Sequence, residues 1–184
     1  MAEIIATTDR LILRTQMDGD LADWMRHLNT PDVTACLGGV RTEAQVVEKF
    51  ARMAKSQAEN GFAFMMVTLK DGTFLGTVGM APIERDGPPD TLRGAVQIGW
   101  QLRADYWGQG YAHEAARAVI ALAFERHGIE TLYSQTSQSN APSWRLMEKL
   151  GLTRREDLDY EDPAYPPKDN PTIVYALSRE GWQP

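Results

Sequence analysis

Residues 106–115, YWGQGYAHEA, place two glycines one residue apart directly before an alanine-rich stretch that favours a helix. Because glycine has no Cβ, phosphate oxygens can approach its backbone closely. The first amides of a helix lack partners within the helix, and together with the positive end of the helix dipole they attract an anion. The segment therefore predicts a phosphate-binding loop before a helix, with a plain glycine turn as its structural alternative.

Two other glycine-rich phosphate sites differ from this segment. The third glycine of the dinucleotide-binding fingerprint is replaced by His113, and RADYW separates the glycines from the preceding predicted strand, where a tight turn is needed. A P-loop carries a lysine after its second glycine, and none follows Gly110. The pattern disfavours both a dinucleotide site and hydrolysis of a magnesium nucleotide.

His113 and Glu114 also begin the HExxH motif of zinc hydrolases, in which a second histidine lies four residues after the first. That position is Arg117, whose positive charge would repel the metal, and the other histidines, His27 and His127, do not restore the spacing. The sequence therefore predicts no metal site.

The elements that must position this loop follow from hydrophobic periodicity. Alternating apolar and polar residues predict strands, and apolar residues at helical spacing predict helices. The predicted strands cover residues 10–15, 62–69, 74–83, 95–102, 131–137, 152–158 and 172–178. The predicted helices lie within residues 18–29, 42–61, 111–128 and 140–151.

Two of these elements carry further local signals. Thr42 and Gln45 form a capping-box pattern at the start of the second helix, and Gly61 is positioned to end it. Gly99 interrupts its strand and marks either a bulge or a close backbone approach. The elements predict one mixed α/β domain over residues 1–184, without a uniform βαβ order.

The composition indicates an ordinary globular protein whose net charge of −6 comes from 25 acidic and 19 basic residues. This balance disfavours non-specific nucleic-acid binding, which depends on clustered positive charge. The first residues, MAEIIATTDR, do not show the basic region followed by an apolar run that is typical of a secretory signal. The longest apolar run, FAFMMV, is too short to span a bilayer. We expect a cytoplasmic protein without a membrane partner, acting as a monomer or homodimer.

A second segment, SNAPSWRLMEKLG, is explained in part by a helix that begins at Asn140 with Pro142 in its first turn. Taken together, the two segments resemble the GNAT superfamily of acyl-CoA-dependent N-acyltransferases. The pyrophosphate signature of that family, Q/R-x-x-G-x-G/A, is matched by residues 107–112, with Trp107 at the Gln/Arg position. The downstream pattern of the family is matched by Asn140, Ser143, Lys149 and Gly151. RLILR near the start and YWGQGYAHEA are more similar to the Rim-type branch, which includes ribosomal-protein N-terminal acetyltransferases.

The resemblance implies a central twisted, mostly antiparallel sheet flanked by helices, in which two neighbouring parallel strands splay apart. Those strands are residues 96–102 and 131–137, and the pantetheine arm of acetyl-CoA, the implied cosubstrate, lies in the gap. The resemblance also implies which groups bind acetyl-CoA, and it implies no metal ion. The pantetheine arm and thioester are bound by backbone groups around Gln101, Leu102 and Arg103 and by Asn140, with Ser143 close to the sulfur. The pyrophosphate is bound by the amides of Gly108, Gln109, Gly110, Tyr111, Ala112 and His113.

The implied reaction is direct attack of a neutral primary amine on the thioester in a ternary complex, which needs a polarised carbonyl and removal of a proton. Many family members protonate the leaving thiolate with a tyrosine, but Met147 stands at that position. Ser143 is therefore the predicted acid, with bonding of a free helix-start amide as its structural alternative. Cys36 is expected to be a buried, unreactive thiol because no histidine adjoins it in sequence.

The residues do not identify a general base. Gln97 stands where some relatives carry a strand glutamate, and an amide cannot usefully accept a proton. The region where an acceptor would enter is flanked by Glu84, Glu161, Tyr160 and Tyr165, each of which is also explained as a surface group.

We therefore expect an acetyl-CoA-dependent N-acetyltransferase whose acceptor is a protein N-terminal α-amine or a small amine. The acidic loop around residues 157–162 favours a cationic acceptor. Two alternatives remain. One is an acetyltransferase that modifies small molecules or antibiotics, and the other is a non-catalytic acyl-CoA sensor, which the absent tyrosine and glutamate favour.

Overall fold

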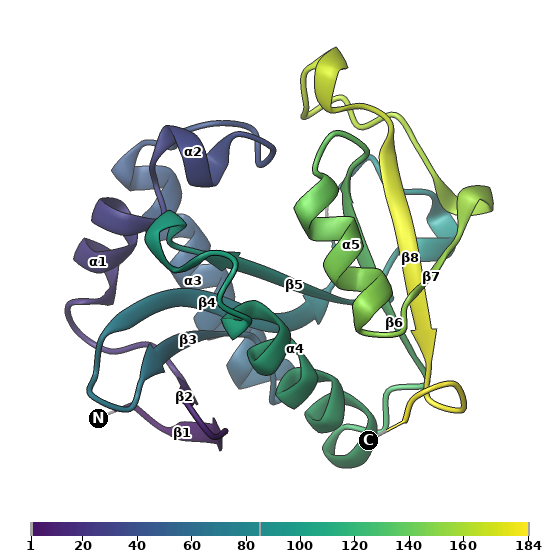
Figure 1. Ribbon diagram of the computed structural model, residues 1–184. Helices are drawn as coiled ribbons and strands as arrows, with labels where there is room; N and C mark the ends of the chain where they lie inside the picture. The colour runs from purple at the N-terminus through teal and green to yellow at the C-terminus, as the bar shows by residue number, and fades with distance from the viewer. Residues whose placement is uncertain (1, 85, 184) are drawn as a thin grey trace.

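An eight-stranded sheet crosses the computed structural model, which describes residues 2–84 and 86–183. Its strands lie in the order β1-β2-β3-β4-β5-β6-β8-β7, and neighbours are antiparallel except for the parallel pair β5–β6 (Figure 1). The strands are β1 (Ile4–Thr7), β2 (Leu11–Arg14), β3 (Phe64–Leu69), β4 (Phe74–Pro82), β5 (Val96–Leu102), β6 (Thr131–Ser137), β7 (Thr153–Arg154) and β8 (Thr172–Ser178).

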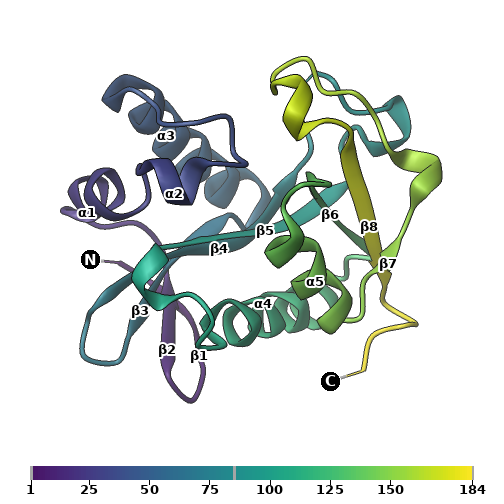
Figure 2. The ribbon, with the colours of Figure 1, turned by 45° about the horizontal axis from the view of Figure 1, so that its top comes forward.

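Helices cover both faces of this sheet. They are α1 (Asp20–His27), α2 (Pro31–Thr34), α3 (Glu43–Asn60), α4 (Tyr111–Ala121) and α5 (Ala141–Lys149). Figures 1 and 2 show α1, α2 and α3 on one face of β3–β5, and α4 and α5 on the other. Strand alternation explains the two resulting cores. Met65 and Val67 of β3 belong to the cluster that contains the buried side of α4, whereas Met66 between them packs with Trp24 of α1.

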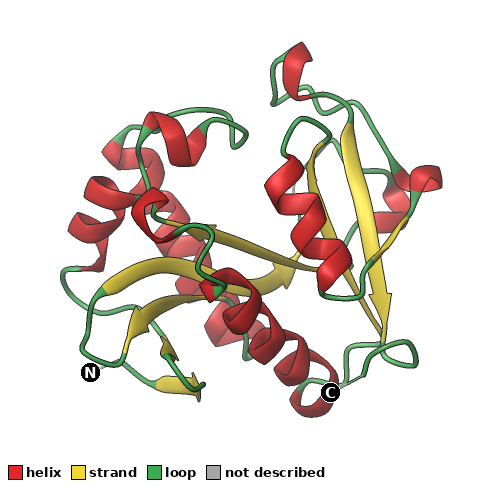
Figure 3. Cartoon of the chain, viewed as in Figure 1, coloured by secondary structure: helices red, strands yellow, loops and turns green. Residues whose placement is uncertain are grey.

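The parallel pair β5–β6 separates along its length. Of the seven residues of β5, Val96 and Gln97 pair with β6. At the next residue, the Ser134 hydroxyl donates to the Ile98 carbonyl at 3.0 Å, so a side chain takes the place of a ladder bond. Figures 1 and 3 show β6 and β8 turned away from β5 beyond this point. The expectation of a mostly antiparallel sheet with a splayed parallel pair is confirmed.

Local sequence signals place the ends of the long helices. The Thr42 hydroxyl accepts from the Gln45 amide at 3.3 Å, and the Gln45 side chain accepts from the Thr42 amide at 2.9 Å, so the predicted capping box begins α3. Gly61 ends α3 with a left-handed φ of 75°, which suits glycine. α4 continues through a π-helical turn, Leu122–Arg126, and ends at His127, as predicted.

Gly99 does not mark a bulge. It lies opposite Gly79 in a regular part of the β4–β5 pair. A Cβ on Gly99 would lie 3.2 Å from the Phe64 ring, and one on Gly79 would lie 2.3 Å from the Phe64 Cα. The two glycines therefore make room for Phe64 of β3.

The predicted strand at 152–158 is wrong over most of its length, because β7 covers only Thr153–Arg154. The Leu158 amide bonds to the Arg155 carbonyl at 2.9 Å, so a 3-10 turn at Glu156–Leu158 interrupts the pairing with β8, which returns as a single bridge at Tyr160.

Hydrophobic periodicity also does not predict β1 or α2, which are four residues each. Thr30 and Pro31 are the available signal for α2. The Thr30 side chain accepts from the Val33 amide, and proline suits the first turn of a helix.

Candidate active site

The glycine loop, Gly108–Gly110, leads directly into α4. Gly108 has a φ of 74° and Gly110 a φ of 83°, in the left-handed region that residues with a Cβ rarely adopt. A Cβ built on Gly108 would have no heavy atom within 4 Å. The backbone conformation therefore requires both glycines, and the loop is open at Gly108 for a ligand to approach.

The first turn of α4 presents backbone donors beside the glycine loop. The Glu114 amide bonds to the Gly110 carbonyl at 3.0 Å, and Gly110 supplies no capping side chain. The amides of Tyr111, Ala112 and His113 precede that bond and have no partner within the helix. Donors in this arrangement, at the positive end of the helix dipole, are suited to an anion such as the pyrophosphate expected from the sequence.

Trp107 connects the glycine loop to the end of β5. Its indole N–H donates to the Leu102 carbonyl at 2.8 Å, and the residue is 52% exposed. Tryptophan at the Gln/Arg position of the signature thus anchors the loop to the strand through a side-chain hydrogen bond.

The edge of β5 that faces the gap is set by strand alternation. The Arg103 amide donates to the Leu75 carbonyl at 2.9 Å, toward β4. Because successive residues direct their backbone groups to opposite edges, Gln101 also faces β4, whereas Trp100 and Leu102 face the gap. Of the three predicted pantetheine-binding positions, Leu102 therefore lies toward the gap and Gln101 and Arg103 do not. Trp100, which is not among the predicted positions, also faces the gap.

The side chains of Gln101 and Arg103 hold neighbouring segments instead. Gln101 donates to the Leu28 carbonyl at 3.2 Å, at the end of α1. The Arg103 guanidinium donates to both Asp105 carboxylate oxygens at 2.7 Å and to the Phe74 carbonyl at 3.2 Å. The hydrogen bond from Arg103 lowers the pKa of Asp105. These contacts position the end of β5.

Asn140 and Ser143 lie at the start of α5, which packs on β6. The Asn140 side chain donates to the Thr136 hydroxyl at 3.0 Å and does not cap the helix. Within residues 2–84 and 86–183, the Ser143 hydroxyl makes no hydrogen bond, so amide capping does not account for it. Met147 is 1% exposed in the core and offers no proton.

A row of polar side chains crosses the strands where β5 and β6 begin to separate. The Tyr160 hydroxyl donates to Gln135 Oε1 at 2.6 Å, and Gln135 Nε2 donates to Gln97 Oε1 at 3.1 Å. The predicted Glu84 and Glu161 alternatives are both exposed. The row contains no carboxylate, and the hydroxyl of Tyr160, one of the predicted alternatives, is engaged as a donor to Gln135.

Asp169 lies near the end of β6, in a 3-10 turn (Pro167–Asp169) that precedes β8. It is 3% exposed, and its Oδ1 accepts from the Ser139 hydroxyl at 3.3 Å. Its Oδ2 is buried and has no hydrogen-bond donor within the described residues. The Ser137 and Ser139 hydroxyls are 2.6 Å apart. A donor with positive charge would complete this group, because a buried carboxylate oxygen without a donor is costly.

Cys36 approaches the same group from the segment after α2. Its Sγ lies 4.0 Å from the Ser139 hydroxyl oxygen. It is partly exposed rather than buried as expected, because the loop that carries it lies at the surface. Its neighbour here is a serine, which does not activate a thiol as a histidine would.

Among the described residues, His, Cys, Asp and Glu side chains do not gather in threes as metal ligands would. In the same part of the chain, every helix is too short or too polar to cross a membrane.

The sequence comparisons give a family and a distant relative. Residues 10–153 match the family model of the acetyltransferase (GNAT) domain. The FsC-acetyl coenzyme A-N(2)-transacetylase of Aspergillus fumigatus is 31% identical over 119 residues, which cover 63% of this chain and 50% of that protein. The match therefore spans half the length of this relative.

Solved structures share the fold. An acetyltransferase from Agrobacterium tumefaciens superposes with a TM-score of 0.76 at 26% identity, over 94% of this chain and 92% of that one. RimL, a ribosomal L7/L12 alpha-N-protein acetyltransferase in complex with coenzyme A, superposes with a TM-score of 0.74 over 96% of this chain and 98% of that one. Its identity of 16% shows a common fold and does not assign this chain to the Rim-type branch.

Proposed function

Because the chain belongs to the GNAT acetyltransferase family, we propose that it transfers the acetyl group of acetyl-CoA to a primary amine by direct attack in a ternary complex. The observation that carries this proposal is the set of unpaired α4 amides beside the glycine loop, next to the gap between β5 and β6. An anion site beside separated strand edges suits the two parts of coenzyme A, its pyrophosphate and its amide-containing pantetheine arm.

In this proposal the amides within residues 108–113 bind the pyrophosphate, and the pantetheine arm lies between β5 and β6. Backbone groups of Trp100 and the amide of Leu102 would bond the arm from β5, since the Leu102 carbonyl already accepts from Trp107. The Asn140 side chain would bond the arm from the β6 side. A β5 amide would donate to the thioester carbonyl and stabilise the negative charge that develops on its oxygen.

The reaction begins when the amine nitrogen attacks the thioester carbon, and the carbon–sulfur bond then breaks. The nitrogen loses one proton, and coenzyme A leaves as a thiol after gaining one. Ser143 is the proposed donor of that proton, because its hydroxyl has no other partner in the described residues. We assign no carboxylate as the base, and propose that the bound ammonium group first gives a proton to water, so that the neutral amine attacks and then gives a second proton to water.

The proposed acceptor is a cationic amine that becomes neutral in the site, either a protein N-terminus or a small molecule. One protein related in sequence is named as an N(2)-transacetylase, and one related in structure is named as an alpha-N-protein acetyltransferase. Asp169 supports a cationic acceptor through its negative charge beside the serine hydroxyls, and a direct bond from an ammonium group to its buried Oδ2 would require the residues around it to move.

A thiol-release assay with acetyl-CoA and a panel of amines tests the proposal. The panel holds peptides with free N-termini, peptides with a free lysine, polyamines and small monoamines. We expect release of coenzyme A thiol with at least one class. Binding of acetyl-CoA without thiol release for any amine would instead favour the sensor, the alternative supported by Met147 and Gln97.

A further inference from the structure

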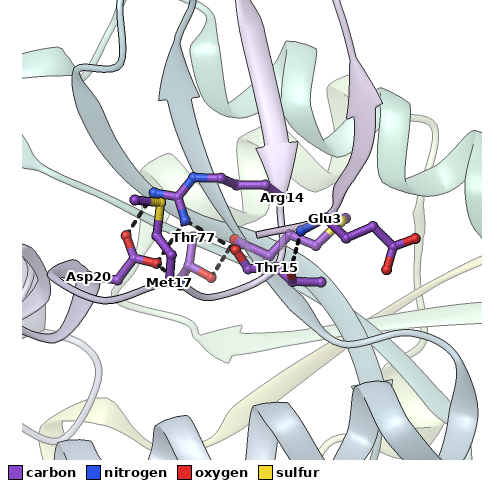
Figure 4. Close-up of polar contacts among 7 residues, drawn as sticks. Glu3, Arg14, Thr15, Met17, Asp20 and Thr77 are labelled. Carbon is purple, nitrogen blue, oxygen red and sulfur yellow. Dashed lines mark hydrogen bonds and ion pairs between the residues drawn. The ribbon is translucent and has the colours of Figure 1, made fainter. Parts of the chain in front are cut away.

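The two arginines of the segment RLILR (10–14) serve different parts of the molecule. Arg14 donates to both carboxylate oxygens of Asp20 at 2.7 Å, and Asp20 also accepts from the Met17 amide at 2.7 Å (Figure 4). Asp20 is 2% exposed. Arg14 therefore holds the start of α1 and has no contact with the candidate site.

Arg10 instead reaches the glycine loop from the turn between β1 and β2. Its Nε donates to Glu114 Oε2 at 2.6 Å, and its Nη1 donates to the Gln109 carbonyl at 3.0 Å. The guanidinium lies 4.3 Å from the centre of the Tyr111 ring. A Cβ built on Gly110 would meet its Nη2 at 3.4 Å. One side chain thus contacts the loop and the first turn of α4 together.

Glu114 is bound from the same turn by other groups. The Arg10 amide donates to its Oε1 at 2.9 Å, and the Thr8 hydroxyl donates to the same oxygen at 2.6 Å. Burial by itself would raise the pKa of Glu114, but the hydrogen bonds from Thr8 and Arg10 and the charge of Arg10 outweigh it and lower that pKa. Glu114 is therefore ionised near neutral pH.

The ionised Glu114 creates an electrostatic conflict at the candidate anion site. It lies one residue after the three unpaired amides of α4, where its negative charge would repel a pyrophosphate. The Gln109 carbonyl is a second group that an anion would avoid, because its oxygen carries partial negative charge. Arg10 donates to both groups, so it offsets the charge of the first and satisfies the second with a hydrogen bond.

We propose that Arg10 is a positioning residue for the pyrophosphate of acetyl-CoA, which it serves by neutralising Glu114 and holding the Gln109 carbonyl. The inference rests on the proposed function, since it takes coenzyme A as the ligand of the loop. It assigns a cofactor-related role to the first arginine of RLILR, and a purely structural role to the second.

A double-mutant cycle that removes each of the two charges, measured by titration calorimetry with coenzyme A, tests this. We expect Arg10→Gln to weaken binding about tenfold or more, since it leaves the negative charge of Glu114 without its cationic partner beside the phosphates. Glu114→Gln alone should not weaken binding. The double variant Arg10→Gln/Glu114→Gln should return to within about threefold of wild type, because the repulsive charge is gone.

The controls separate this role from folding. Arg14→Gln, the other arginine of the segment, should lower the melting temperature and leave coenzyme A affinity unchanged. Added salt should shrink the Arg10→Gln defect, because salt screens charge repulsion. If Arg10→Gln does not fold, Arg10→Lys replaces it. It lacks the planar fork that bonds Glu114 and Gln109 together, so binding about threefold weaker is expected.

Three results would overturn the inference while leaving the proposed function intact. They are wild-type affinity in Arg10→Gln, wild-type affinity in a folded Arg10→Lys used in its place, and a double variant as weak as Arg10→Gln. If the wild-type protein does not bind coenzyme A, the proposed function fails first, and the inference fails with it.

Discussion

The Ser139 hydroxyl donates to Asp169 Oδ1 at 3.3 Å, while Oδ2 of the same carboxylate is buried and has no hydrogen-bond donor within the described residues. Ser139 lies between β6 and α5, next to Asn140 at the start of that helix, whereas Asp169 comes from the turn before β8. A carboxylate in this state can accept from an ammonium group, which brings up to three donors and the opposite charge.

Asp169→Asn should therefore raise the Michaelis constant for a cationic amine about tenfold, since a hydrogen bond between charged groups is lost. The constant for acetyl-CoA should stay the same. Hydroxylamine, which is uncharged near neutral pH, is the control acceptor and should show little change. Equal losses for both acceptors would show that Asp169 maintains the fold of the loop rather than binding charge.

A charged side chain at Gly108 should block coenzyme A binding. Aspartate and asparagine at this position share the strain of the left-handed φ of 74°, and the space around a Cβ there is open. The difference between Gly108→Asp and Gly108→Asn in calorimetry therefore reports charge repulsion at the loop. We expect the aspartate variant to bind at least about tenfold more weakly. Equal affinities would place the pyrophosphate elsewhere.

Asn140 and Ser143 should affect different kinetic constants. Asn140→Ala should raise the Michaelis constant for acetyl-CoA severalfold, because it removes a ligand hydrogen bond worth roughly 1 kcal/mol. Ser143→Ala should lower turnover more than binding if the hydroxyl protonates the thiolate. Lower melting temperatures with normal kinetics in both variants would indicate that both side chains only stabilise α5.

Lys49 should make stability depend on pH. Its Nζ lies 4.5 Å from the centre of the Trp24 ring, and burial, with repulsion from Arg41 and Arg52, lowers the pKa of Lys49 to about 7. Between this value and its unfolded pKa near 10.4, the unfolded chain binds a proton that the folded chain does not, so this residue's contribution to stability rises with pH.

Lys49→Met keeps the apolar stem and removes that charge. We expect a higher melting temperature than wild type at pH 7, with the difference narrowing toward pH 10. A difference that stays constant between these two pH values would show that the lysine pKa is not lowered in the folded protein.

Much of the fold could be predicted from local signals in the sequence. The residues of β5 whose backbone groups face the gap could not. The capping box at Thr42 and the glycine at 61 act within a few residues, so their outcome does not depend on the rest of the chain. Which residues of β5 face the gap depends instead on its register with β4. The bond from the Arg103 amide to the Leu75 carbonyl fixes that register.

The contact of Arg10 with Glu114 likewise could not be predicted from the sequence, because it joins distant parts of the chain. The two residues are 104 positions apart, and RLILR alone gives no sign that one arginine turns to the glycine loop and the other to α1. Asp169 is similar, because in the sequence it is one of several acidic residues in a polar loop. Its burial and its unpaired oxygen are properties of the folded chain, in which Asp169 meets Ser139, 30 residues earlier in the sequence.

The absence of an assigned base predicts a preference among amines. Near pH 7, an α-amine with a pKa of about 7.7–8.0 holds roughly a few hundred times more neutral form than a lysine side chain near 10.4. Peptides with only a free N-terminus should therefore react faster than matched peptides with only a free lysine, and the rate should rise with pH toward the acceptor pKa. Faster lysine acetylation at neutral pH would point to a base, with Glu84 and Glu161 the first to substitute.

The most direct measurement follows acetyl-CoA and the peptide with a free N-terminus together, by thiol release and by peptide mass. Acetyl transfer in this site predicts one acetyl group added to the peptide for each thiol released, and loss of both in Gly108→Asp. Thiol release without peptide acetylation, or peptide acetylation that persists unchanged in Gly108→Asp, would contradict the account.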